Sequence, residues 1–192
     1  MAEQALKDRM TVDEFIDWAV TQPSGRFELL DGKVYAMSPE RVAHARTKAR
    51  VWQELDRAIG ARGLPCEALP DGLTVPIDET TSYEPDVLVR CGEPLDPDAV
   101  KVADPIIVVE VVSRSSRGLD SGTKLVDYFK LPGLVHYLVI DLIRHVIVHH
   151  GRDGALGIRT TVHHDGALRL DPPGIEVAVA ACFVDGRGPS GR

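Results

Sequence analysis

Two carboxylates lie inside apolar stretches of the sequence, where a charge is costly unless it has a partner. Asp86 comes directly before the apolar residues 87–89, and Glu110 lies within residues 106–112 (IIVVEVV), whose other members are all β-branched and apolar. Such runs are typical of strands that are buried on both faces. Burying an unpaired carboxylate is strongly unfavourable, so each acid needs a cation, a donor or a proton.

Two neighbouring strands can bring Asp86 and Glu110 to one divalent ion. Mg²⁺ prefers hard oxygen ligands and keeps several of its water molecules. An ion of this kind can activate water and neutralise the charge that builds on a phosphate during cleavage. The pair therefore predicts a metal site for phosphodiester chemistry. The structural alternative is that Asp86 only caps its strand and Glu110 pairs with an arginine.

Lys124 is the third candidate, in a helix predicted over residues 119–131. It lies at the border of the apolar stripe that Leu125, Tyr128 and Phe129 form, one turn before Tyr128. From there it can lean back toward the strand of Glu110. A lysine in that place would orient or deprotonate the attacking water, or steady the phosphoryl oxygens. The alternative is a solvated helix lysine, which is the more common fate of a lone lysine.

The rest of the chain predicts a mixed α/β fold that can position these residues. Thr11 and Glu14 form a capping box at the start of a short helix. An apolar stripe at spacings of three and four predicts a long helix over residues 39–62. Strands are predicted at residues 26–30, 33–37, 66–69, 73–77, 83–89, 106–112, 135–141 and 145–150, with weaker strands over 155–170 and a last apolar piece at 175–184. This order indicates one central, mixed, mostly antiparallel sheet flanked by helices.

Two Asp-Gly pairs predict β-hairpins. Asp31-Gly32 joins the first two predicted strands, and Asp71-Gly72 lies between the next two. Side chains alternate along a strand, so Glu28 in the first hairpin shares a face with the apolar Leu30.

Length and composition indicate one globular domain. The 192 residues are expected to form a single domain over residues 1–184, with a Gly/Pro-rich, disordered tail at 185–192. The net charge of −7 argues against a dedicated nucleic-acid binder, but metal-holding acids lower the charge of a nuclease in the same way. No apolar run approaches the roughly 20 residues of a membrane span. The charged N-terminus does not resemble a signal peptide, so we expect a cytoplasmic protein.

The cysteines and histidines indicate no metal centre of their own. Cys66, Cys91 and Cys182 are far apart and lack a Cys-x-x-Cys pair, so we expect three reduced thiols. Several histidines lie on C-terminal strands that could be neighbours. No cysteine or carboxylate joins them at a ligand spacing, which disfavours a zinc site. These histidines are His145, His149, His150, His163 and His164.

Taken in order, the motifs resemble the Uma2 family of restriction-endonuclease-like proteins, a branch of the PD-(D/E)xK nucleases. The resemblance runs from about Thr11 to Asp141. It implies a restriction endonuclease-like fold, a homodimer, and cleavage of DNA phosphodiester bonds with Mg²⁺ or Mn²⁺. The motifs that carry it are FELLDGKVYAMSP (27–39), His44, EPDVLV (84–89), VVEVVS (108–113), Asp120 with KLVDY (124–128), and VHYLVID (135–141).

The resemblance also implies roles for individual residues. Glu28, Asp86 and Glu110 would form the acidic cluster that holds the metal, with the backbone carbonyl of Val111 as a further ligand. Lys124 would be the catalytic lysine. His44, near the start of the long helix, would lie close to the acids as a hydrogen-bond donor behind the ligands, although a surface histidine fits its position about as well.

The chain departs from the superfamily pattern in two places. The superfamily lysine usually comes two residues after the second acid, and that position here is Val112. In Uma2-like sequences the lysine lies in the following helix, where Lys124 stands. The loop after the strand usually reads Ser-Pro-Ser-Thr, whereas here Arg114 replaces the proline. Arg114 and Arg117 could hold DNA phosphates from this loop, although exposed loops often carry arginines without such a role.

Two other functions compete with a nuclease. One is a catalytically inactive DNA-binding or protein-interaction module of the same fold, which the acidic net charge and the displaced lysine favour. The other is a glycosidase, because two carboxylates suffice for that chemistry. Aromatic residues make up only 5% of the chain, which argues against a sugar-binding cleft.

Overall fold

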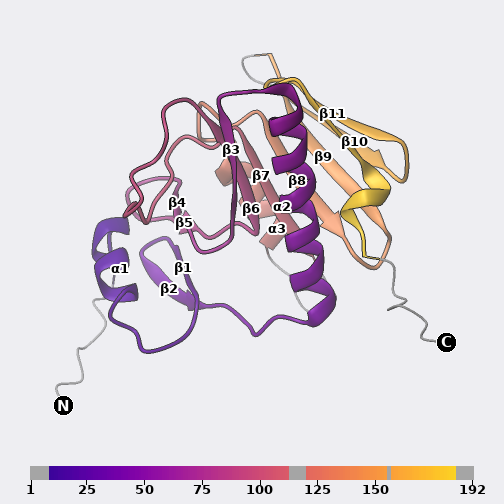
Figure 1. Ribbon diagram of the computed structural model, residues 1–192. Coiled ribbons are helices and arrows are strands. Elements are labelled where there is room, and N and C mark those ends of the chain that lie inside the picture. Colours follow the sequence, from indigo (N-terminus) through magenta and orange to yellow (C-terminus); the bar gives the residue numbers. More distant parts are fainter. Residues whose placement is uncertain (1–8, 113–119, 155–156, 185–192) are drawn as a thin grey trace.

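The computed structural model describes residues 9–112, 120–154 and 157–184 (Figure 1). The loop with Arg114 and Arg117 and the predicted tail lie outside the described residues. The order of helices and strands confirms the mixed α/β class. None of the described helices is long and apolar enough to cross a membrane. The extent of the domain stays a prediction.

The larger sheet has six strands in the order β10-β9-β8-β7-β6-β3 (Figure 1). Among its pairs, β7 and β8 run parallel and the others antiparallel, which confirms a mixed, mostly antiparallel sheet. The strands are β3 (Cys66–Pro70), β6 (Val87–Cys91), β7 (Ile107–Val112), β8 (His136–Asp141), β9 (Val146–Asp153) and β10 (Gly157–His163).

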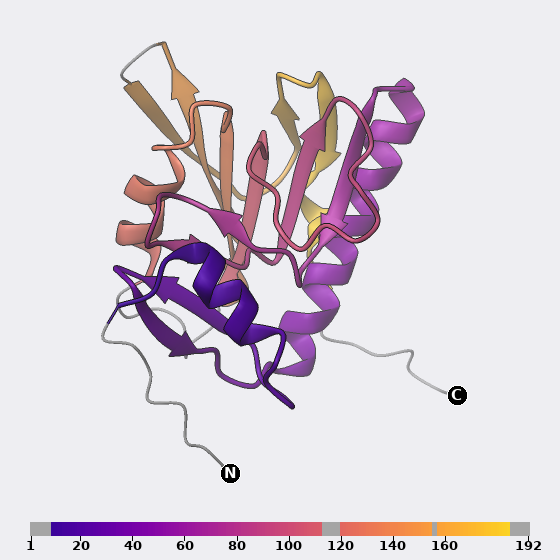
Figure 2. The same ribbon diagram turned by 90° about the vertical axis from the view of Figure 1, so that its left-hand side faces the viewer.

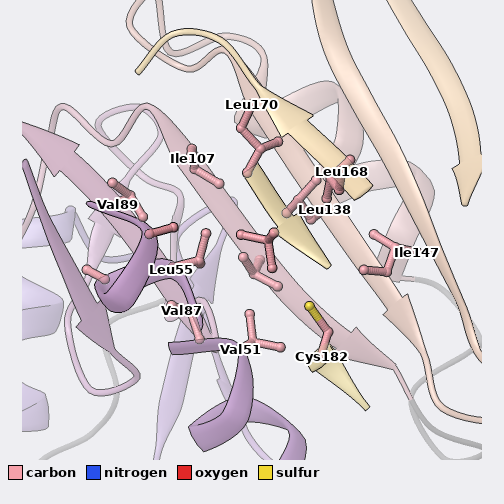
Figure 3. Close-up of a cluster of buried hydrophobic side chains, with 14 of the residues drawn as sticks. Val51, Leu55, Val87, Val89, Ile107, Leu138, Ile147, Leu168, Leu170 and Cys182 are labelled. Atoms are coloured by element: carbon pink, nitrogen blue, oxygen red, sulfur yellow. The ribbon is translucent and has the colours of Figure 1, made fainter. Parts of the chain in front are cut away.

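Helices and a β-ribbon cover the two faces of this sheet. α2 (Val42–Arg62) packs on one face together with the ribbon of β11 (Ala167–Leu170) and β12 (Ile175–Ala178), which the 3-10 helix η1 (Val179–Cys182) follows. Figure 3 shows the apolar side chains that fill this layer. α3 (Asp120–Tyr128) packs on the other face.

Alternation along β7 decides which helix Glu110 meets. Ile107 and Val109 lie in the core under α2, whereas Val108 lies in the core under α3. Successive side chains of a strand point to opposite faces, so Glu110 faces α3 with Val108. The burial of β7 between two layers confirms that its apolar run is a strand with both faces covered.

A smaller sheet stands beside the ends of β6 and β7 that carry the acids. Its strand order is β2 (Lys33–Ala36), β1 (Phe27–Leu30), β5 (Ser82–Tyr83) and β4 (Val75–Pro76). Figure 2 shows α1 (Val12–Ala19) lying against this sheet. Glu28 belongs to β1, so the smaller sheet brings this acid toward the ends of β6 and β7.

The first hairpin and the first helix cap form as the sequence predicts. Asp31 and Gly32 adopt φ angles of 50° and 76°, the left-handed values that the tight turn between β1 and β2 requires. Thr11 accepts a hydrogen bond from the Glu14 backbone, and the Glu14 side chain accepts one from the Thr11 backbone. Both signals are local, so the sequence neighbours suffice to form them.

The predicted strand over residues 83–89 is wrong in one respect, because the chain leaves one sheet and enters the other within it. β5 ends at Tyr83 and β6 begins at Val87. Pro85 lies between them, and a proline lacks the N–H that a continuous strand would need. The break places Glu84 and Asp86 at the junction of the two sheets.

The predicted hairpin around Asp71-Gly72 is also wrong. β3 pairs with β6 in the larger sheet, whereas β4 pairs with β5 in the smaller one. Gly72 has a φ of 110°, so the chain does turn at this point. The turn redirects the chain from one sheet to the other and does not fold it back on itself.

The expectation of three reduced thiols is contradicted for two of the cysteines. Cys66 on β3 and Cys91 on β6 are register partners, and their sulfurs form a disulfide. Cys182 is a buried free thiol. The sequence did not predict this disulfide because 25 residues separate the two cysteines. It depends on β3 joining β6, which no local pattern predicts.

This disulfide gives a prediction about the purified protein. Denatured without reductant, the chain should expose one reactive thiol, Cys182, and after reduction all three cysteines should react. Reduction should also lower the free energy of unfolding by about 3 kcal/mol, because the bond closes a loop of 25 residues. Thiol titration and denaturant unfolding measure the two effects. Three reactive thiols before reduction would contradict the disulfide.

Candidate metal and catalytic site

The predicted site residues meet around one cavity of about 270 Å³. It lies where the smaller sheet, the ends of β6 and β7, α2 and α3 come together. Residues that the sequence places up to 96 positions apart share it. Its lining includes Glu28, His44, Asp86, Glu110, Val111 and Lys124.

Lys124 bridges two acids. Its Nζ donates to Glu110 Oε1 at 3.1 Å and to Glu28 Oε1 at 2.9 Å. The ammonium group also lies 4.9 Å from the centre of the Tyr83 ring. The side chain is only 4% exposed, so its charge depends on these partners. Lys124 thus reaches the acid on β7 from the following helix, and the solvated alternative is excluded.

One carboxylate oxygen of Glu110 accepts two hydrogen bonds from α3. The hydroxyl of Tyr128 donates to Glu110 Oε1 at 2.9 Å, the same oxygen that Lys124 contacts. Lys124 and Tyr128 are four residues apart on α3, so both point to one face of the helix. Among the described residues no donor binds Glu110 Oε2. That oxygen is therefore the one left for an ion.

Asp86 and the backbone of Val111 form a second contact pair. Asp86 Oδ2 accepts the Val111 N–H at 2.7 Å, which ties the end of β6 to β7. His44 from α2 places Nε2 at 2.7 Å from the Val111 carbonyl oxygen and 3.4 Å from Asp86 Oδ2. With the proton on Nε2, His44 donates to the carbonyl that is the predicted metal ligand.

Glu28 is oriented toward the lysine. Its Oε1 accepts a hydrogen bond from Lys124 and one from the Glu84 N–H at 3.2 Å. Glu84 lies at the break between β5 and β6, so the same break that positions Asp86 also positions Glu28. The three predicted acids therefore line one cavity, with Glu28 on its lysine side.

Three residues in or beside the site had no role in the sequence interpretation. Tyr128 appeared only as an apolar helix residue. Lys48 lies four residues after His44, so the two share one face of α2. Glu40 lies four residues before His44, just ahead of the start of that helix. The spacing was visible in the sequence, but nothing local showed that this face turns toward Asp86. Glu40, His44 and Asp86 offer ligand atoms that all lie within 4.8 Å of one another.

The pKa values of the two central acids, Glu110 and Asp86, are shifted in opposite directions. Burial raises the pKa of Glu110 to about 8, and the charges of Asp86 and Glu28 add to this while Lys124 opposes it. Burial also disfavours the charge on Asp86. Hydrogen bonding and attraction from His44, with the Val111 N–H, outweigh that and keep the pKa of Asp86 below its usual range.

His44 responds in turn to its neighbours. Burial disfavours its charge, but the contacts with Asp86, the Val111 carbonyl and Glu40 raise the pKa of His44 above its usual value. Among the described residues, Nδ1 of His44 is buried without a hydrogen-bond partner, and Glu40 Oε2 lies 3.6 Å from it. The site thus combines excess acid with an unsatisfied imidazole nitrogen.

This donor set fits a hard divalent ion. Two carboxylates and a backbone carbonyl supply oxygen ligands, which Mg²⁺ and Mn²⁺ prefer. Burial, together with the charges of Asp86 and Glu28, raises the proton affinity of Glu110, and a bound cation would replace that proton. The residues present are therefore compatible with the metal that the sequence predicts.

The raised pKa of Glu110 makes metal-free stability depend on pH. Between about pH 4.5 and about pH 8 the folded state keeps a proton that the unfolded state loses, so stability falls as pH rises. Each pKa unit is worth about 1.4 kcal/mol. We expect a loss of a few kcal/mol in EDTA-treated wild type across this range, and a smaller loss in Glu110→Gln. Denaturant unfolding at several pH values measures this, and equal slopes in the two proteins would contradict it.

Comparisons with known proteins match the chain to one family. The profile of the Uma2 family, described as "Putative restriction endonuclease", matches residues 12–180. Two uncharacterized proteins of Synechocystis are similar to the chain. The protein sll1609 is 29% identical over 136 residues, 69% of this chain and 76% of the relative. The protein slr1290 is 27% identical over 178 residues, 91% of this chain and 92% of the relative.

A solved structure has the same fold. The crystal structure of a "putative nuclease belonging to DUF820" from Anabaena variabilis superposes with a TM-score of 0.71 and covers 91% of this chain and 97% of its own. The sequences are 16% identical, so this likeness concerns the fold. The family profile extends from α1 to η1 and includes every site residue above. The chain therefore belongs to the Uma2 family of restriction-endonuclease-like proteins.

Proposed function

We propose that the protein is an endonuclease that hydrolyses DNA phosphodiester bonds with a bound Mg²⁺ or Mn²⁺ ion. The observation that carries the proposal is the contact between Lys124 and Glu110. Val112 cannot supply the usual lysine, and α3 brings an ammonium group to the same acid. Membership of the Uma2 family supports nuclease chemistry.

We assign the metal to Asp86, Glu110 and the Val111 carbonyl. Glu28, which the sequence also placed among the ligands, has its Oε1 bound to Lys124, and we assign it to holding that lysine. The ion would act as a Lewis acid on a phosphoryl oxygen and would activate a water molecule. Several contacts support this set, because the chain already orients each ligand. The Val111 N–H holds Asp86 Oδ2, whereas Lys124 and Tyr128 hold Glu110 Oε1, so Glu110 Oε2 is the oxygen that we assign to the ion.

Lys124 would act on the reacting phosphate and water. Its Nζ carries the protons that it donates to Glu28 and Glu110, and it can redirect one of them to a phosphoryl oxygen or to the attacking water. The contact between Glu28 and Lys124 supports a role for Glu28 in holding the lysine within the acidic cluster. His44 would hold the Val111 carbonyl and Asp86 in place.

DNA would approach along the cavity that these residues line. Arg41 is an exposed cation at its edge and could contact a phosphate. We also assign phosphate contacts to Arg114 and Arg117, which follow β7 in the sequence. A homodimer, which would present two sites to the two DNA strands, remains a prediction.

A cytoplasmic location also remains a prediction. The Cys66–Cys91 bond counts against it, because disulfides are rare in the reducing cytoplasm.

The alternative is a metal-free interaction module of the same fold. One observation favours it: Lys124 lies between Glu28 and Glu110 and compensates their charge without an ion. In this alternative the cluster serves only to join β1, β7 and α3. Metal binding and DNA cleavage separate the two functions.

The first test is cleavage of plasmid DNA. Wild type should cut with Mg²⁺ or Mn²⁺ and stop in EDTA. Lys124→Met should lower the rate at least about 100-fold, because the phosphoryl oxygens and the water lose their donor. Lys101→Met is the matched control, since Lys101 is an exposed lysine paired with Asp13 away from the cavity, and it should cut like wild type. Intact DNA with concentrated wild type and both ions would overturn the nuclease.

The second test is stabilisation by metal. Mn²⁺ at about 100 times its Kd should raise the free energy of unfolding of wild type by about 2.7 kcal/mol. Glu110→Gln should lose most of this gain, because an amide is a weaker ligand than a carboxylate. Thermal or denaturant unfolding with and without Mn²⁺ measures it. A wild type that Mn²⁺ does not stabilise would favour the metal-free module.

A further inference from the structure

Behind Asp86 lies a second group of charges that the proposed mechanism does not use. Lys48 on α2 places its ammonium against Glu40 Oε1, at 2.7 Å from Asp71 Oδ2 and 3.5 Å from Asp86 Oδ1. Its side chain is 7% exposed. A lysine that is buried this deeply among carboxylates acts as a fixed internal cation.

Arg26 completes this group of charges. Its guanidinium lies 2.5 Å from Glu40, 2.7 Å from Asp71 and 2.6 Å from Glu84. Glu40 and Asp71 each contact both cations, whereas Asp86 contacts only Lys48 of the two. Lys48 is therefore the one of these two cations that contacts Asp86, through its Oδ1.

Lys48 lies next to a group of residues that could bind a metal ion. Glu40, His44 and Asp86 present ligand atoms within 4.8 Å of one another, which is a spacing that one ion could bridge. Lys48 already contacts two of these three residues. It lines a separate cavity beside Trp52 and is absent from the lining of the site cavity, so it does not meet the substrate.

We propose that the site holds a single divalent ion and that Lys48 is the fixed charge in place of a second one. This inference rests on the proposed function. Two-metal nucleases place their ions about 3.5–4 Å apart on shared carboxylates. Here Asp86 is the carboxylate that would be shared: its Oδ2 accepts the N–H of Val111, whose carbonyl we assign to the ion, and its Oδ1 lies 3.5 Å from Lys48 Nζ. Lys48 is thus a positioning residue that orients Asp86 and excludes a second cation.

The number of bound ions tests this directly. Isothermal titration of the full chain with Mn²⁺ should give one ion for wild type. Lys48→Met removes the charge at similar length, so Glu40, His44 and Asp86 should admit a second, weaker ion. Lys48→Arg keeps the cation and should bind one ion. Arg50→Met is the matched control, because Arg50 is an exposed cation of the same helix, and it should also bind one ion.

The outcomes distinguish this inference from the proposed function. Two ions in wild type, or a single ion in both wild type and Lys48→Met, would overturn the role of Lys48 and leave the nuclease intact. No Mn²⁺ binding by wild type would overturn both. If Lys48→Met does not fold, Lys48→Met with Asp71→Asn removes one charge of each sign and takes its place in the titration. A loss of stability alone does not change the count, so the count separates positioning from a structural role.

Discussion

The contact between Lys124 and Glu110 is the interaction on which the site depends. A carboxylate in the middle of a covered strand is unfavourable by itself, and a buried lysine is unfavourable by itself. Together, with Glu28 and the Tyr128 hydroxyl, they satisfy each other. Because these residues come from β1, β7 and α3, the ion pair also fixes the relative position of the smaller sheet, the larger sheet and a helix.

The break at Pro85 has a comparable influence through the backbone. Pro85 prevents one continuous strand, and the chain crosses from the smaller sheet to the larger one between Tyr83 and Val87. The Glu84 N–H then reaches Glu28, and Asp86 reaches the Val111 N–H. A single residue without an amide proton thus places two acids of the site at the junction of the sheets.

The net charge of −7 conceals how the charges are arranged. Arg26 forms an ion pair with Glu40, and Lys48 forms one with Asp71. Lys124 forms ion pairs with Glu28 and Glu110. The acidic composition therefore includes carboxylates that have internal cations as partners. His44, the Val111 N–H and Lys48 lower the pKa of Asp86 against the effect of burial, whereas burial raises the pKa of Glu110.

The sequence by itself determined the features that depend on near neighbours. These are the capping box at Thr11, the turn at Asp31-Gly32, the long helix and the buried strand that carries Glu110. Their signals are propensity and periodicity, which act over a few residues. The sequence also suggested which acids belong together, through the resemblance to Uma2 proteins.

Only the tertiary structure decided which strands pair and which charges are buried. β3 joins β6 across 25 residues and forms the Cys66–Cys91 bond, although Asp71-Gly72 looks like a hairpin turn. Lys48 resembles the exposed Arg46 and Arg50 in the sequence, yet it is buried against Asp86. Burial is a property of what packs against a residue, and the partners of Lys48 are up to 38 positions away because distant segments meet there.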